Sequence, residues 1–268
     1  MPFQPCSDRH AIAEVVFGIR LEQMPTPGDV EKMISTHDKF REKLPRLTRA
    51  DGFSIFIGDG PPPQQPPPAI SFESYKIDGT HAWRLRLENN AILVNCLDYS
   101  RWAQVKEESL NFILAVSEPL FQKTPNMTEV YLQYVDKFVW MEPSGTPLNQ
   151  LLDSKGSKGS LVPPHTFERG ENWHCNQGWF FDAKHESVAR GLERLNLGAK
   201  AENDGQVVTI DDFLHLTLNR PEVFETALSQ GGMLDQMFEL LHKKNKETLN
   251  KILTDSIKNR IKLNGGSE

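Results

Sequence analysis

Two stretches in which apolar and polar residues alternate constrain the fold of this chain most. In residues 14–22 one side carries Phe17 and Ile19, and in residues 130–140 one side carries Leu132 and its apolar neighbours two residues apart. A period of two is the pattern of a β-strand with one buried face. Each stretch is therefore expected to be a long strand that packs one face against a core.

The rest of the chain can be divided into helices and strands. The signals are apolar residues at helical spacing, prolines, and residues typical of turns. Helices are predicted at residues 28–43, 101–120, 148–153 and 231–263. Further strands are predicted at residues 53–57, 70–77, 81–88, 91–97, 179–181, 188–197 and 207–218. Each half of the chain then has the same order, namely a long strand, a helix, several strands and a long closing helix.

This repeated order predicts an α+β protein of two related halves, residues 1–125 and 126–268. Each half is expected to be an antiparallel sheet with one face covered by a long helix, as in TBP-like or helix-grip folds. Residues 153–160, with the sequence DSKGSKGS, are expected to form a flexible linker in the second half. Because the halves share little residue identity, the prediction rests on element order alone.

Composition restricts the class of protein. Of 268 residues, 30 are Lys or Arg and 36 are Asp or Glu, so the net charge of −6 disfavours attraction to nucleic acid. The three cysteines are too few for a disulfide framework or a cysteine-based zinc site. No apolar run approaches the roughly 20 residues that span a bilayer. We therefore expect a cytoplasmic protein that binds neither membrane nor nucleic acid.

Four segments carry a resemblance to a known family. In chain order they are EVVFGIRLE, VYLQYVDKF, IDDFLHLTL and MLDQMFELLHKKNKETLNKILTDSI. The chain resembles, over nearly its whole length, a sporadically distributed family of bacterial proteins of about 250 residues that is defined by sequence alone. The resemblance implies a bacterial accessory role, of the kind found in mobile or defence-associated gene sets, and it transfers no site residue.

The alternation of side chains along the strands indicates a candidate ligand surface, and we call this alternation the parity of a strand. If the apolar sides of the strands face the helices, a set of polar residues points to the opposite face of the sheet. Two guanidinium groups on such a face could grip a carboxylate or phosphate. The alternative is a solvated face with ion pairs across the strands. The candidate ligand residues are Arg20, Arg84, Arg86, Asp211 and His215.

Catalytic and metal-binding residues are only weakly indicated. The chain has no P-loop, GxGxxG, GxSxG or HExxH motif. Asp136, on an apolar strand face, must be either paired or raised in pKa, and with His215 it is a candidate general base. The polar stretch 165–185 is rich in potential ligands but matches no zinc signature. Its candidate metal ligands are His165, His174, Cys175 and His185.

The last predicted helix offers a candidate interface. Met233, Met237 and Phe238 could form an adaptable apolar patch that docks on a second copy or another bacterial protein. The alternative is that these residues are part of the helix's own buried stripe.

Together these features favour a non-enzymatic binding protein that acts through association with itself or with a bacterial partner. The alternatives are a sensor that binds a small anionic ligand or nucleotide on the polar sheet face, and a hydrolytic enzyme with a metal or a carboxylate and histidine site. Whether the chain is an enzyme is left undecided, with the missing motifs weighing against it. No cofactor is implied by the sequence.

Overall fold

The fold is that of a computed structural model, which describes residues 3–7, 10–50, 69–123, 126–140, 147–153, 161–202, 205–228 and 231–264. The predicted strand at 53–57 and almost all of the predicted linker at 153–160 lie outside these residues. Among the described residues, no helix is both long and apolar enough to cross a lipid bilayer.

More of the described residues lie in strands than in helices. They are β1 (Gln4–Pro5), β2 (Ile12–Leu21), β3 (Arg46–Ala50), β4 (Ala69–Tyr75), β5 (His81–Glu88), β6 (Ala91–Cys96), β7 (Asn126–Trp140), β8 (Trp173–Phe181), β9 (Val188–Glu202) and β10 (Gly205–Val223). The α-helices are α1 (Pro27–Ser35), α2 (Trp102–Ser117), α3 (Phe224–Ala227), α4 (Met233–Ile252) and α5 (Asp255–Arg260). Short 3₁₀ helices are η1 (Thr36–Lys39), η2 (Glu118–Lys123), η3 (Leu148–Gln150) and η4 (Pro164–Glu168).

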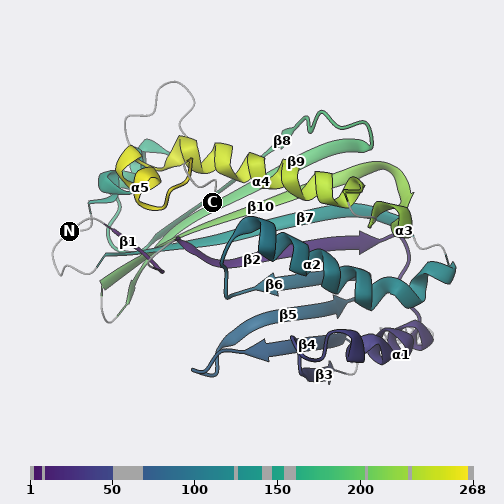
Figure 1. Ribbon diagram of the computed structural model, residues 1–268. Coiled ribbons are helices and arrows are strands. Elements are labelled where there is room, and N and C mark those ends of the chain that lie inside the picture. Colours follow the sequence, from purple (N-terminus) through teal and green to yellow (C-terminus); the bar gives the residue numbers. More distant parts are fainter. Residues whose placement is uncertain are drawn as a thin grey trace, which may run out of the picture.

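The strands join into one antiparallel sheet in the order β3-β4-β5-β6-β2-β7-β10-β9-β8, with β1 added beside β7. The two long alternating strands predicted from the sequence, β2 and β7, are neighbours in the middle of this order. Helices α2 and α4 lie on the same face of the sheet, and the opposite face carries no described helix (Figure 1). The chain is thus α+β with a large antiparallel sheet, as the sequence predicts. We call the two sides of the sheet the covered face and the open face.

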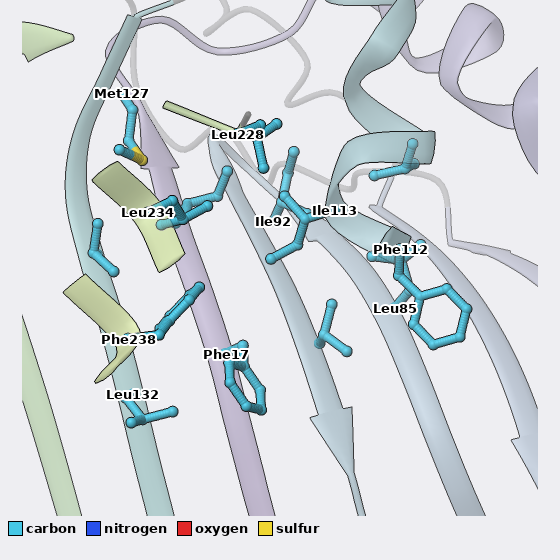
Figure 2. Packing of buried hydrophobic residues seen from close by; sticks show 14 of the residues in the cluster. Phe17, Leu85, Ile92, Phe112, Ile113, Met127, Leu132, Leu228, Leu234 and Phe238 are labelled. Carbon is cyan, nitrogen blue, oxygen red and sulfur yellow. The ribbon is translucent and has the colours of Figure 1, made fainter. Parts of the chain in front are cut away.

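The covered face holds the core. Phe17 on β2 packs against Phe238 of α4 with ring centroids 5.0 Å apart and stacks on Trp102 of α2 at 5.5 Å. Figure 2 shows Phe17 among Leu132, Phe238 and Ile113, which come from β7, α4 and α2. A second apolar cluster lies under the C-terminal half of α4 and α5. Alternation along the strands therefore has the buried side that the sequence predicts.

The first helix is shorter than the predicted 28–43. It begins as expected, because the Thr26 side chain accepts from the backbone N–H of Asp29 and the Asp29 carboxylate accepts from Thr26. It ends at Ser35, and the chain tightens into η1. The buried His37 ring is hydrogen-bonded to the Leu44 carbonyl at 2.7 Å, which folds the following segment back instead of extending the helix.

The closing helix is not continuous over 231–263. It breaks between α4 and α5, where Leu253 forms a β-bridge with Leu152 and the Thr254 N–H donates to the Leu151 carbonyl. These bonds satisfy backbone groups that a continuous helix would otherwise pair within itself. Apolar periodicity continues through the break, since Ile257 is buried, and for that reason the sequence pattern gives no sign of it.

Other differences are local. The helix predicted at 148–153 is the short 3₁₀ helix η3, and the strand predicted at 179–181 is the nine-residue β8. Strand β3 was not predicted. The hairpin of β5 and β6 turns at Asn89 and Asn90 as expected, with Asn89 at φ 55°, a conformation that asparagine tolerates.

Candidate functional site

The open face gathers all five predicted ligand residues. Each lies between two residues of its strand that face the helices. In β10, for example, Asp212 and Leu214 are fully buried, whereas the residues on either side of them in the strand are not. Their placement on one face is therefore as predicted from parity, while ligand binding itself stays a prediction. The five residues are Arg20 on β2, Arg84 and Arg86 on β5, and Asp211 and His215 on β10.

The middle of the open face is hollowed. A pocket of ≈ 360 Å³ lies over β5, β6, β2 and β7 and reaches Phe213 of β10. Its apolar floor includes Val16, Ala91 and Leu93. Its polar lining includes Glu14, Arg20, Arg86, Glu88, Asn89, Asn95, Tyr131 and Gln133. The pocket lies at the small end of the range for ligand sites and combines an apolar base with a few polar groups, as such sites do.

Gly18 shapes this region. A Cβ atom at Gly18 would lie 2.8 Å from Leu93 Cδ2 and 3.0 Å from Tyr131 Cδ2, closer than side chains normally approach. The absence of a side chain lets Leu93 and Tyr131 pack across β2, one from each neighbouring strand. The pocket wall therefore depends on a glycine in the interior of a strand.

Arg20 is held in place by residues of β7 and of the turn between β5 and β6. Its Nε donates to Glu129 Oε2 at 2.7 Å and to the Tyr131 hydroxyl at 2.6 Å, and its Nη1 donates to Asn90 Oδ1 at 2.9 Å. The Tyr131 hydroxyl in turn donates to Glu129. The guanidinium is thus positioned before any ligand arrives, with 41% of the side chain still exposed.

Arg86 enters the pocket from β5. Its Nε donates to Asn95 Oδ1 at 3.0 Å, Asn95 Nδ2 donates to Glu14 Oε1 at 2.6 Å, and the guanidinium also pairs with Glu88. Arg84 does not join it. Arg84 Nε lies 3.6 Å from Glu73 Oε1, outside the pocket lining. The two arginines that line the pocket are thus Arg20 and Arg86, rather than the expected pair Arg84 and Arg86.

His215 lies beside this network. Its Nε2 is buried and has no hydrogen-bond partner among the described residues, and it lies 3.5 Å from Glu129 Oε2. The His215 ring is 4.9 Å from that of Tyr131. Burial lowers the pKa of His215, an effect that Glu129 opposes and Arg20 reinforces. Burial alone would raise the pKa of Glu129, but the bonds from Tyr131 and Arg20 outweigh it and the pKa is lowered. At neutral pH the site thus contains a neutral imidazole and an ionised carboxylate.

Asp211 is fixed by two amides and does not pair with His215. Gln133 Nε2 donates to Asp211 Oδ1 at 2.7 Å, and Asn196 Nδ2 donates to Asp211 Oδ2 at 3.2 Å. Beside it, the Arg194 guanidinium lies 4.3 Å from the centre of the Phe213 ring. Such a cation–π contact keeps an arginine flat on the open face.

Sequence reasoning missed four residues at the centre of the site, and parity could have found them. The predicted strand at 130–140 exposes the side opposite Leu132. Extending that parity gives the odd-numbered residues, and applying it to residues 91–97 gives Asn95. The four missed residues are Glu129, Tyr131, Gln133 and Asn95.

The covered face carries three buried acids between its two apolar clusters. Asp136 is 2% exposed and Asp212 and Glu193 are fully buried. Asn245 Nδ2 donates to Asp212 Oδ2 at 2.9 Å, and Lys244 Nζ lies 3.3 Å from Glu193 Oε2. In the part of the chain that the structure describes, Asp136 Oδ2 and Asp212 Oδ1 have no hydrogen-bond partner. Burial raises the pKa of Asp136 to about 7, and burial with nearby Glu193 raises that of Asp212.

An ion pair and a raised pKa were the two outcomes expected for Asp136 from its strand position. Within the described residues it has no ion-pair partner, and its pKa is raised. It lies on the face opposite His215, so the two candidate catalytic residues do not share a site. Its neighbours on that face include Tyr134, whose hydroxyl is 2.7 Å from His242 Nδ1.

The candidate metal ligands are dispersed. His165 is in η4, His174 and Cys175 are consecutive on β8 and face opposite sides of the sheet, and His185 Nδ1 accepts from the Ser187 N–H in the following turn. Within the described residues, no three His, Cys, Asp or Glu side chains are grouped so that they could hold a metal ion.

The predicted interface patch is wrong for Met237 and Phe238. Both are fully buried against the sheet, and Met233 packs at the edge of the same cluster. The reason is that α4 uses this stripe to cover β7 and β10, which is the alternative that the helical spacing left open.

Comparison with known proteins adds no family. No protein-family model matches the chain, and a search of curated proteins finds no significant match. The resemblance to the bacterial family described above therefore stays a prediction.

Proposed function

We propose that this protein is a non-enzymatic binding protein that receives a small anionic ligand in the open-face pocket. The observation that carries the proposal is the approach of Arg20 and Arg86, from strands on either side of β6, to one pocket of ≈ 360 Å³ with an apolar floor. Guanidinium groups favour carboxylate and phosphate oxygens. Under the family resemblance, the role would be that of a bacterial accessory protein.

The acidic residues in the pocket lining restrict the class of ligand further. Glu14 and Glu88 line the same pocket, and Asn95 and Gln133 add amide groups. The two carboxylates would repel an anion that has no hydrogen-bond donors. A ligand with both acidic and donor groups would pair its acidic groups with the arginines and its donor groups with the carboxylates. An amino acid or a nucleotide has this combination.

A second part of the proposal concerns how the two parts of the chain are related. We infer that the chain consists of two related halves, divided near residue 125, in a TBP-like or helix-grip arrangement. Support comes from the central position of β2 and β7, each followed in the chain by further strands and by a long helix on the covered face. The pocket would then lie at the junction of the halves, which is a common place for ligands.

A thermal-shift titration tests the proposed function. Inorganic phosphate, L-glutamate and adenosine monophosphate are the probes, and at least one should raise the unfolding midpoint in proportion to its occupancy. Arg86→Gln should remove the shift. The matched control is Arg41→Gln, which changes an arginine that is 62% exposed and paired with Asp38 away from the pocket. The proposal fails if no probe raises the midpoint, or if both variants respond alike.

A further inference from the structure

The two edges of the sheet differ in how they are protected. One edge is β3, which has five residues and includes Arg46 and Arg49. The other is β8, which has nine residues, WHCNQGWFF, with no charged residue and no proline. Proteins usually block an exposed edge with a short strand, a charge, a proline or a bulge, because unpaired backbone groups attract another strand. Strand β8 has none of these, and its register with β9 is uninterrupted.

The side chains of β8 are also incompletely covered. On the neighbouring strand β9, the residues that face the helices, such as Leu195 and Leu197, are fully buried. On β8 the residues in the same row, including Trp173 and Trp179, are only half-buried, and Phe180 on the open face is 61% exposed. The edge thus exposes part of two tryptophans and a phenylalanine where the rest of the sheet buries its apolar residues.

From these observations we propose that β8 pairs antiparallel with β8 of a second copy of the chain. The two sheets then continue into one another across a two-fold axis (Figure 1 shows β8 as the outermost strand). An isologous contact of this kind uses the same surface on both subunits. It satisfies the outer backbone groups of both strands at once.

The sequence of β8 fits a two-fold axis at Gln177. In that register Trp173 lies opposite Phe181 of the second copy, and His174 lies opposite Phe180. Aromatic pairs in these cross-strand positions stabilise a sheet. Asn176 faces Gly178, where no side chain competes for space.

Charge favours a second copy over a charged partner strand. A two-fold axis places like residues close together, so any charge on β8 would oppose its own copy. The strand is neutral, although the chain carries a net charge of −6.

The mass of the full chain in solution is the first test. Light scattering coupled to size exclusion should give twice the 30.5 kDa of one chain. Asn176→Lys, which adds a charge to the open side of β8 beside the axis, should return the mass to that of one chain. Thr48→Lys adds the same charge to the exposed, opposite edge β3 and should leave the dimer intact.

Cross-linking provides an independent test if Asn176→Lys fails to fold, which circular dichroism would show. Gln177→Cys places one thiol of each copy at the axis, so a short bis-maleimide should link the copies, whereas Thr48→Cys should give no increase over the unsubstituted chain. A single-chain mass at every soluble concentration would overturn the proposal and leave β8 for a different partner strand. A dimer that persists in folded Asn176→Lys, or that Gln177→Cys does not link, would overturn it as well.

Discussion

One strand, β7, carries acids to both faces of the sheet, and the two faces treat them in opposite ways. Glu129 on the open face accepts from Arg20 and Tyr131, and its pKa is lowered. Asp136, seven residues later, points under the helices and has no cationic partner among the described residues, and its pKa is raised to about 7. The comparison shows that the neighbours across the sheet, rather than the residue type, decide whether a carboxylate on this strand is charged.

Polar residues also differ in their accessibility to a ligand on the two faces. On the open face, arginines, amides and a phenol surround the acids and leave side chains that a ligand can reach. On the covered face, the acids lie in a mainly apolar interior, where burying them lowers the stability of the fold. Function is therefore expected on the open face, and a pH-dependent stability on the covered face.

The largest expected difference between the faces concerns two phenylalanines. Phe238→Ala removes a fully buried ring of the core and should lower the free energy of unfolding by about 3–5 kcal/mol. Phe213→Ala, on the open face beneath Arg194, should cost about 1 kcal/mol. Urea denaturation of both variants measures the difference. Equal costs would mean that the open face is covered in solution.

The next effect is the pH dependence of Asp136. Because its pKa is raised from 3.8 to about 7, the unfolded chain ionises first, and the protein loses stability as the pH rises from about 4 to 7. At roughly 1.4 kcal/mol per pH unit, the effect of Asp136→Asn on stability should become more favourable by up to about 4 kcal/mol between pH 4 and pH 8. Urea denaturation at several pH values measures it. A substitution effect independent of pH would contradict the buried placement of this carboxylate.

The smallest expected effect is the pH dependence of Glu129, whose contribution to stability changes with pH in the opposite direction to that of Asp136. The pKa of Glu129 is lowered, so its contribution to stability is present above the unfolded-state pKa near 4.5 and disappears as the pH falls through the folded-state value. Glu129→Gln should cost about 1 kcal/mol at pH 7, because the pair is partly exposed, and nothing at low pH. The same denaturation series tests it, and a cost that grows toward acid pH would be incompatible with the Arg20 contact.

Much of this arrangement could be predicted from alternation alone. The parity of residues 14–22 and 81–88 placed Arg20 and Arg86 on one face, because a strand alternates regardless of which strand lies beside it. The same rule put Asp136 among apolar residues. It could not say which arginine reaches which acid, since partners such as Glu129 and Asn95 depend on strand order.

The remaining errors come from contacts between distant segments. The bridge of Leu253 to Leu152 ends α4 although the apolar periodicity continues. Likewise, Met237 and Phe238 have the spacing of a docking patch and of a core stripe, and only the sheet beneath them decides between the two. Local sequence carries no signal for either choice.

The central pairing of β2 with β7 has a consequence for synthesis on the ribosome. The strands are joined through residues 111 positions apart, such as Arg20 and Tyr131. While the chain is being made, the edge of β2 that will meet β7 has no partner until about half of the protein has emerged. Nascent chains of this protein should therefore depend on chaperones that shield strand edges, more than chains whose first strands pair locally.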